Sequence, residues 1–328
     1  MPINSLLSFH TLTPDCVLDA LENIGVHGDG RLLALNSYEN RVYQIGVEDA
    51  VPVVVKFYRP QRWSDAAILE EHAFVQELAD QEIPVVPAMT LAGCSLHEFK
   101  GFRFAVFPRQ GGRAPELDDP ATRERIGRFI GRIHAVGASK SFLARPGIDI
   151  QSFGKEPLAF LLNNGFVPED LLVAYRTVAE QALEGVRFCF DRAGHVPMIR
   201  LHGDCHAGNV LWTDAGPHFV DFDDSRMGPA VQDLWMLLSG ERDNMARQLA
   251  DILAGYEDFC EFDARQLHLL EALRTLRLIH YAAWLARRWD DPAFPLAFPW
   301  FNTQRYWQDR ILELREQIAL MDEPPLWI

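Results

Sequence analysis

Oxygen-bearing side chains gather in two short stretches about two-thirds of the way along the sequence. The first, HGDCHAGN, places Asp204 and Asn209 in one loop, close enough to point at the same small volume. The second, HFVDFDD, is a short buried-type strand that delivers Asp221 and Asp223 at its end. Hard oxygen ligands suit Mg²⁺, which proteins usually hold with one or two carboxylates together with substrate phosphates. With the other three on metal, Asp204 is free to accept a proton from an attacking hydroxyl.

This division of roles is typical of phosphoryl transfer, in which one Asp positions the acceptor while an Asn and a later Asp hold the metal. The same chemistry needs a cation at the nucleotide phosphates. Lys56 lies in the apolar run VPVVVKFY, where an unpaired ammonium is costly to bury, so a carboxylate partner is expected. The stretch that follows offers Glu70 and Glu71. A strand lysine paired with a helix glutamate is typical of kinases.

The elements that carry these residues change in type near residue 108. Before it, the runs RLLALNSY, NRVYQIGV, VPVVVKFY and FRFAVFP are rich in β-branched or aromatic residues and bounded by turn residues. One helix is predicted between them, in SDAAILEEHAFVQELADQE, with Ser64 as its N-cap. After PRQGGRAPE the apolar period becomes helical. The sequence therefore predicts an α+β, bilobal fold: a small antiparallel sheet lobe (1–108), a linker (109–116) and a mainly helical lobe (117–328), with a ligand cleft between the lobes.

Composition excludes several classes of protein. The formal net charge of −15 argues against non-specific nucleic-acid binding and, less strongly, against an anionic membrane surface, and it favours a cationic acceptor. No apolar run is as long as a bilayer span, and the N-terminus lacks the basic region of a signal peptide. The five cysteines are scattered and contain no C-x-x-C. We expect a cytoplasmic protein without a nucleic-acid or membrane partner.

In the order of these features, the chain resembles the choline kinase and aminoglycoside phosphotransferase superfamily, a branch of the protein-kinase-like fold. The features that carry the resemblance are, in order, Lys56, the helix glutamates, HGDCHAGN and VDFDD. Further segments, including LNSYENRVYQ, GPAVQDLWMLL and RRWDDPAFPLAFPW, are similar to the bacterial stress-response kinases of this superfamily over nearly the whole chain. The resemblance implies an ATP-dependent serine/threonine kinase that uses Mg²⁺, with a protein acceptor of unknown identity; we also expect a monomer. The alternative is a small-molecule kinase acting on a choline-, homoserine- or aminoglycoside-like hydroxyl.

The resemblance also implies roles for residues. Asp204 matches the catalytic aspartate, and Asn209 and Asp221 match the metal ligands. Lys56 matches the lysine that anchors the phosphates, and Glu71 rather than Glu70 matches its ion-pair partner.

The loop 36–41 takes the place of the nucleotide-covering turn, and 106–110 takes the place of the hinge that holds adenine. The nucleotide contacts implied by these matches are Ser37, Asn40, Phe107 and Arg109. Ser37 is also a candidate for autophosphorylation. The loop has no G-x-G-x-x-G, DFDD replaces D-F-G, and no A-P-E follows, so the assignment of a protein substrate depends on family resemblance alone.

Other polar residues have simpler interpretations. We expect His202 to tie the loop to the core and Asp233 to brace it, with Cys205 and His206 outside the chemical step. A transition-metal site at these adjacent residues is disfavoured, because neighbours in sequence rarely converge on one ion. Asp223 is left open as a second metal ligand or a surface charge. A pseudokinase-like binding module is disfavoured because every residue type needed for transfer is present.

Overall fold

The four strand-like runs predicted before residue 108, together with one short strand that was not predicted, β4 (His97–Phe99), form a five-stranded antiparallel sheet in the computed structural model, which describes residues 9–326. The strands are β1 (Gly28–Leu35), β2 (Arg41–Val47), β3 (Val53–Phe57), β4 (His97–Phe99) and β5 (Phe102–Pro108), in the order β1-β2-β3-β5-β4. Lys56 of β3 lies opposite Val42 of β2 and Ala105 of β5. It is therefore on an interior strand rather than at a water-exposed edge.

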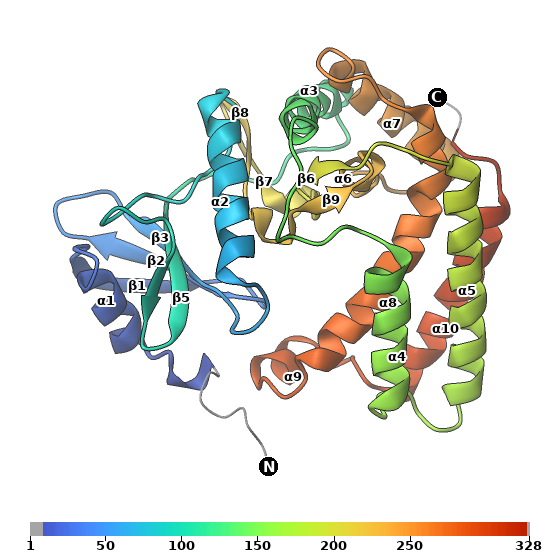
Figure 1. The fold of residues 1–328 in the computed structure, drawn as a ribbon, viewed down its shortest axis with the longest axis horizontal. Helices are drawn as coiled ribbons and strands as arrows, with labels where there is room; N and C mark the ends of the chain where they lie inside the picture. The colour runs from blue at the N-terminus through green and yellow to red at the C-terminus, as the bar shows by residue number, and fades with distance from the viewer. Residues whose placement is uncertain (1–8, 327–328) are drawn as a thin grey trace.

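Two helices pack on this sheet, one more than the sequence predicted. Helix α1 (Pro14–Glu22) buries Val17 and Leu21 against the sheet residues Val55 and Phe104. Its signals were present in the sequence, since Thr13 caps the helix and Pro14 begins it. Helix α2 (Asp65–Asp80) lies between the sheet and the helical half of the molecule (Figure 1). The sequence analysis predicted this second helix and its Ser64 cap, and the structure confirms both.

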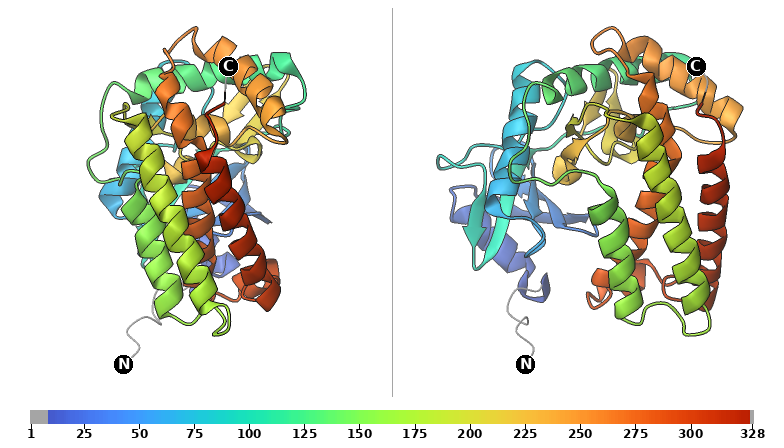
Figure 2. Two further views of the ribbon diagram at one scale, coloured as in Figure 1. Left: turned by 90° about the vertical axis from the view of Figure 1, so that its right-hand side faces the viewer. Right: turned by 45° about the vertical axis from the view of Figure 1, so that its right-hand side comes forward.

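The rest of the chain is mainly helical. Its longer helices are α3 (Pro120–Gly137), α4 (Glu156–Asn163), α5 (Leu172–Ala193), α7 (Arg242–Tyr256), α8 (Leu270–Arg287) and α10 (Gln304–Asp322), and its short ones are α6 (Val231–Trp235) and α9 (Ala293–Ala297). Helices α4, α5, α8 and α10 run side by side as a bundle (Figure 2). Much of the aromatic run after α8 is buried in this bundle, including Phe294, Phe301 and Trp307. No helix within residues 9–326 is long and apolar enough to cross a membrane.

Two small strand pairs lie beside α2 at the centre of the molecule (Figure 1). They are β6 (Ile199–Leu201) with β9 (Arg226–Gly228), and β7 (Val210–Thr213) with β8 (Gly216–Phe219). Short helical turns of 3-10 or π type occupy Phe9–Thr11, Gln151–Lys155, Ala207–Asn209, Phe222–Asp224 and Ala264–Leu269. The loops that follow β6 and β8 carry the two acidic stretches, so the strand pairs hold both stretches against α2.

Helices α3 and α7 touch backbone to backbone. A Cβ atom on Gly127 of α3 would lie 1.9 Å from the carbonyl oxygen of Ile252 on α7, and one on Gly131 would lie 2.5 Å from that of Tyr256. Conversely, a Cβ on Gly255 of α7 would lie 2.0 Å from the carbonyl oxygen of Glu124. Any side chain at these positions would push the helices apart. Their close approach also fixes the distance between the side chains that these helices send toward the loop after β6.

We expect Gly127→Ala to lower the free energy of unfolding by about 1–3 kcal/mol, because the added methyl group meets rigid backbone. Urea unfolding at neutral pH measures the effect. Gly111→Ala is the matched control, since a Cβ there meets nothing within 4 Å. Equal stability of the two variants would contradict the backbone contact.

Candidate functional site

A cavity of about 350 Å³ lies between the sheet and the small strand pairs. Ser37, Lys56, Glu71 and Phe107 line it from the sheet half, and Asn209 and Asp221 line it from the helical half. The structure thus brings six of the predicted site residues to one cavity. The rest of the lining is largely apolar and includes Leu35, Val42, Val54, Ala88 and Leu211. A polar end and an apolar end suit a ligand that carries both charge and a flat hydrophobic group.

Lys56 is held by carboxylates from the far side of the cavity. Its Nζ lies 2.8 Å from Oδ1 of Asp221 and 4.0 Å from Oδ1 of Asp223, and its side chain is 9% exposed. Burial alone would lower the pKa of this ammonium, but the negative charges of Asp221, Asp223 and Glu71 outweigh burial and raise the pKa. Lys56 is therefore a permanent positive charge at the polar end of the cavity.

The predicted ion pair between Lys56 and Glu71 does not form in the structure, so this prediction is wrong. Glu71 does face inward and is buried, but its Oε2 accepts from Nη2 of Arg145 at 2.9 Å. Burial raises the pKa of Glu71 to about 7, although Lys56 and Arg145 both favour its charged form. Arg145 comes from the loop before α4, and its Nη1 also donates to the backbone carbonyls of Asp223 and Ser225.

The neighbouring glutamate has a different role. Glu70 accepts hydrogen bonds from the backbone N–H groups of Leu143, Ala144 and Arg145. It therefore orders the loop that delivers Arg145 to Glu71. The choice of Glu71 over Glu70 as the inward-facing residue is confirmed by its burial.

The loop after β6 is fixed by the buried carboxylate of Asp233. Its two oxygens accept from the backbone N–H groups of His202, at 2.9 Å, and Gly203, at 2.8 Å. The same carboxylate lies 3.0 Å from Nε2 of His134 on α3, whose Nδ1 lies 3.0 Å from the hydroxyl of Tyr256 on α7. The predicted bracing role of Asp233 is confirmed, and the bracing reaches back to the α3–α7 contact.

Two further contacts set the conformation of this loop. The Nε2 of His202 lies 2.9 Å from the carbonyl oxygen of Val220, which confirms that His202 ties the loop to the core. Gly203 has φ +85°, and a Cβ there would lie 2.2 Å from the carbonyl oxygen of Asp224. Glycine is therefore required immediately before Asp204.

Asn209 and Asp221 present oxygen atoms to the cavity. The amide nitrogen of Asn209 donates to the carbonyl of Asp204 at 2.9 Å, so its amide oxygen is the atom that remains for a ligand. Asp221 has a left-handed backbone with φ 62°, an uncommon conformation for a residue other than glycine. Its side chain is 52% exposed, and Lys56 contacts only one of its oxygens. Within residues 9–326, no group of three or more His, Cys, Asp or Glu side chains could hold a metal ion.

Asp223 is not a surface charge, because it is 3% exposed. Its Oδ2 accepts from Nδ2 of Asn40 at 3.1 Å and also from the guanidinium of Arg62. Asn40 is itself buried, and its Oδ1 accepts from the backbone N–H of Arg59 at 3.0 Å. Neither Asn40 nor Asp223 lines the cavity. The hydrogen bond between Asn40 and Asp223 therefore joins the loop 36–41 to the helical half outside the cavity.

Arg109 also departs from its predicted place. Its Nε donates to Oε1 of Gln44 on β2 at 2.9 Å, and its side chain does not line the cavity. Phe107 and Gln110, on either side, do line it. The predicted adenine-holding segment therefore borders the cavity, but without the guanidinium.

The carboxylate of Asp204 has two neighbours that the sequence analysis did not predict. Nη2 of Arg277 on α8 lies 2.9 Å from its Oδ1, and Nε2 of His206 lies 3.5 Å from its Oδ2. Burial would raise the pKa of Asp204, but the contacts with His206 and Arg277 outweigh burial and lower it. The available signal was an arginine within the apolar helical run LEALRTLRLIHYAAW.

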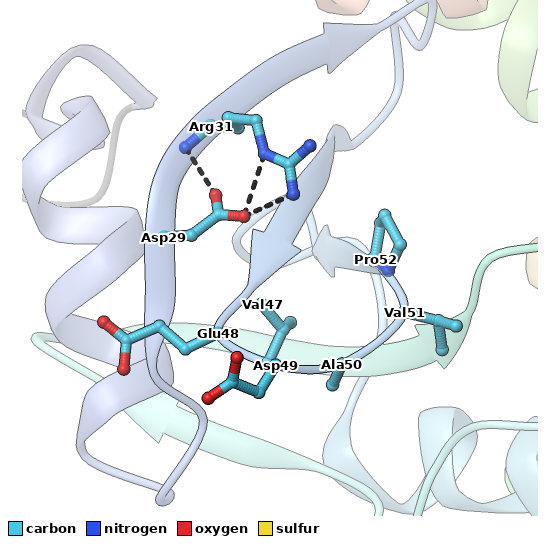
Figure 3. A pocket seen from close by; sticks show the side chains of 8 residues that line it. All are labelled: Asp29, Arg31, Val47, Glu48, Asp49, Ala50, Val51 and Pro52. Carbon is cyan, nitrogen blue, oxygen red and sulfur yellow. Dashed lines mark hydrogen bonds and ion pairs between the residues drawn. The ribbon is translucent and has the colours of Figure 1, made fainter.

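A second hollow, at the outer end of β1 and β2, has no comparable chemistry (Figure 3). Asp29 and Arg31 on its border bond each other, with Nε of Arg31 donating to Oδ2 of Asp29 at 2.8 Å. None of the predicted site residues lines this hollow.

Comparison with known proteins places the chain in a family. Residues 31–270 match the model of the phosphotransferase enzyme family, a range that includes Lys56, Asp204 and Asp221. Stress response kinase A of Escherichia coli K12 is 45% identical over 323 residues, which cover 98% of each chain. Serine/threonine protein kinase RdoA of Salmonella typhimurium LT2 is 44% identical with the same coverage.

A solved structure shows the same fold at low sequence identity. Amicoumacin kinase hAmiN, in complex with AMP-PNP, Ca²⁺ and Ami, superposes with a TM-score of 0.73 at 19% identity, covering 95% of this chain and 94% of that one. The α+β kinase-like fold predicted from the sequence is thereby confirmed. The chain therefore belongs to the phosphotransferase enzyme family, and within it the chain is similar to the bacterial stress response kinases.

Proposed function

We propose that this chain is an ATP-dependent serine/threonine kinase of a bacterial stress response, acting in the cytoplasm. The observation that carries the proposal is the pairing of Lys56 with Asp221 across the cavity, with Asn209 on the same wall. The name of the Salmonella relative supports the choice of a serine/threonine acceptor, and the name of the Escherichia coli relative supports a role in a stress response.

ATP fits the two ends of the cavity. Its adenine would lie among Val42, Val54, Ala88 and Phe107, and its phosphates would lie near Lys56. Asn209 and Asp221 would hold Mg²⁺ together with those phosphates, and the bound ion would neutralise charge on the transferred group. The AMP-PNP and Ca²⁺ bound to hAmiN support a need for a divalent metal, and Mg²⁺ is our specific proposal.

Asp204 would act on the acceptor. Its lowered pKa keeps the carboxylate charged, so it can accept a hydrogen bond from the acceptor hydroxyl and then take its proton. The hydroxyl oxygen forms a bond to the γ-phosphorus as the bond from that phosphorus to the β–γ bridging oxygen breaks, and ADP leaves.

A small-molecule kinase is the second candidate. It is favoured by the fold shared with amicoumacin kinase over nearly the whole chain. The position of Lys56, Asp204 and Asp221 suits either acceptor. The two candidate functions therefore differ only in the identity of the acceptor.

We expect Asp204→Ala to reduce phosphate transfer by about 10²–10⁴-fold while Mg·ATP binding largely survives, because the base is lost and the phosphate site is kept. Asp221→Ala should lose turnover and also weaken Mg·ATP binding. Steady-state kinetics and nucleotide titration measure the two effects. Asp309→Ala on α10 is the control, and near wild-type transfer by Asp204→Ala would show that its role is wrongly assigned.

Incubation with γ-labelled ATP and Mg²⁺ tests the acceptor class. We expect label on Ser or Thr of proteins in a bacterial extract. Parallel reactions contain choline, homoserine or an aminoglycoside, and label on one of these but not on protein would favour the second candidate. No labelled product in any reaction would contradict a phosphotransferase.

Ser37 lines the cavity within the loop 36–41, which makes it a candidate for autophosphorylation. We expect phosphopeptide mapping after incubation with ATP and Mg²⁺ to find label on Ser37 of the wild type. Asp221→Ala, which should not transfer phosphate, is the control. An unlabelled Ser37 in active wild-type protein would leave it only a nucleotide contact.

A further inference from the structure

Positively charged and imidazole groups border the face of Asp204 where an acceptor must approach. The side chains of Arg277 and His206 are each 42% exposed, whereas that of Asp204 is 23% exposed. Both groups are thus more accessible to an approaching ligand than the carboxylate that they contact. The chain as a whole carries a net charge of −15, so the positive charge of Arg277 beside Asp204 is a local feature that the overall charge does not predict.

Arg277 differs from other arginines at this end of the molecule in the partner it holds. Arg274, one turn earlier on α8, pairs with Glu271, and Arg288 at the end of α8 pairs with Glu39. Among the described residues, Asp204 is the one carboxylate within ion-pair distance of Arg277. The charge of Arg277 is thus balanced by the very group that must bind the acceptor.

This pairing opposes the proposed role of Asp204. The guanidinium lies against the carboxylate, with Nη2 of Arg277 2.9 Å from Oδ1 of Asp204. An acceptor hydroxyl that binds the carboxylate must share it with this guanidinium or displace it. A second anion, supplied by the acceptor, would draw Arg277 off Asp204 and leave the carboxylate free for the hydroxyl.

We infer that Arg277 is the residue that selects the acceptor, by binding an anionic group, a carboxylate or a phosphate, carried next to the reacting hydroxyl. The inference rests on the proposed function and narrows it: a protein substrate would carry an acidic residue beside its Ser or Thr. A cationic acceptor would meet Arg277 with like charge. We therefore expect an acceptor with an anionic group, in place of the cationic acceptor that the net charge favoured.

The pairing of Arg277 with Asp204 also limits hydrolysis of ATP by water. While no acceptor is bound, Arg277 holds Asp204 and a water molecule at the site is poorly activated. Removal of the guanidinium should therefore raise ATP hydrolysis in the absence of acceptor, a readout that a merely structural arginine would not change.

Three peptides of equal length test the inference, each with one Ser flanked by Asp, Ala or Lys. For the wild type we expect kcat/KM to be roughly 10-fold or more higher for the Asp peptide than for the Lys peptide, as the loss of one charged hydrogen bond implies. Arg277→Gln should reduce this ratio to near one, mainly through KM for the Asp peptide, and should raise hydrolysis without acceptor. Arg277→Glu should favour the Lys peptide.

Arg305→Gln is the matched control, because it makes the same charge change on the exposed face of α10 and should keep the wild-type preference. Homoserine and choline, small acceptors with and without a carboxylate, form parallel arms. Preference for homoserine with no peptide labelled would support the inference while contradicting the proposed protein kinase. Equal use of Asp and Lys peptides by the wild type, or an equal loss for all peptides in Arg277→Gln, would overturn the inference and leave the proposed function standing.

Discussion

The ammonium of Lys56 sits inside an apolar sheet and finds its negative charges on the other half of the molecule. A buried charge of this kind is tolerable only with partners, and removing one partner from a buried pair typically costs about 3–5 kcal/mol. Asp221 and Asp223 supply the partners, and Arg62 of the sheet half in turn contacts Asp223 and Asp224. Each half thus carries charged side chains whose ion-pair partners lie on the other half. These ion pairs join the two halves beside the cavity that both of them line.

The loop 36–41 is held by a second set of contacts between the halves. Glu39 lies 2.6 Å from Arg288 and accepts from the indole N–H of Trp284, while Arg41 lies 3.0 Å from Asp291. These partners lie on α8 or just after it. Since α8 also carries Arg277, one helix contacts both the loop 36–41 and Asp204. The loop proposed to cover the nucleotide and the carboxylate proposed to bind the acceptor are therefore positioned by the same helix.

The acidic loop after β6 depends on packing far from the cavity. Backbone contact between α3 and α7 sets the positions of His134 and Tyr256, which in turn orient Asp233. Asp233 then fixes the backbone that leads to Asp204. A residue that acts as a base, as we propose for Asp204, must be held precisely to contribute to transfer, and these buried contacts hold the loop in place.

The sequence by itself determined the element types, the kinase-like α+β fold and the residues of the acidic loops. These follow from local rules, because periodicity selects helix or strand and a short loop keeps Asp204 and Asn209 close whatever surrounds them. It also predicted the bracing by Asp233, whose place early in a helix limits its reach. In the sheet lobe it missed two short elements, α1 and the three-residue strand β4, for which no periodic pattern was identified.

Only the tertiary structure decided which charges meet. Glu71 pairs with Arg145, 74 residues away, and Lys56 pairs with Asp221, 165 residues away. Tertiary packing likewise sets three other features of the site. These are the burial of Asp223, the outward turn of Arg109 and the contact of Arg277 with Asp204. A sequence states which residues carry charge, but ion pairing falls off steeply with distance. Partners are therefore chosen by how the two halves pack, which no local pattern contains.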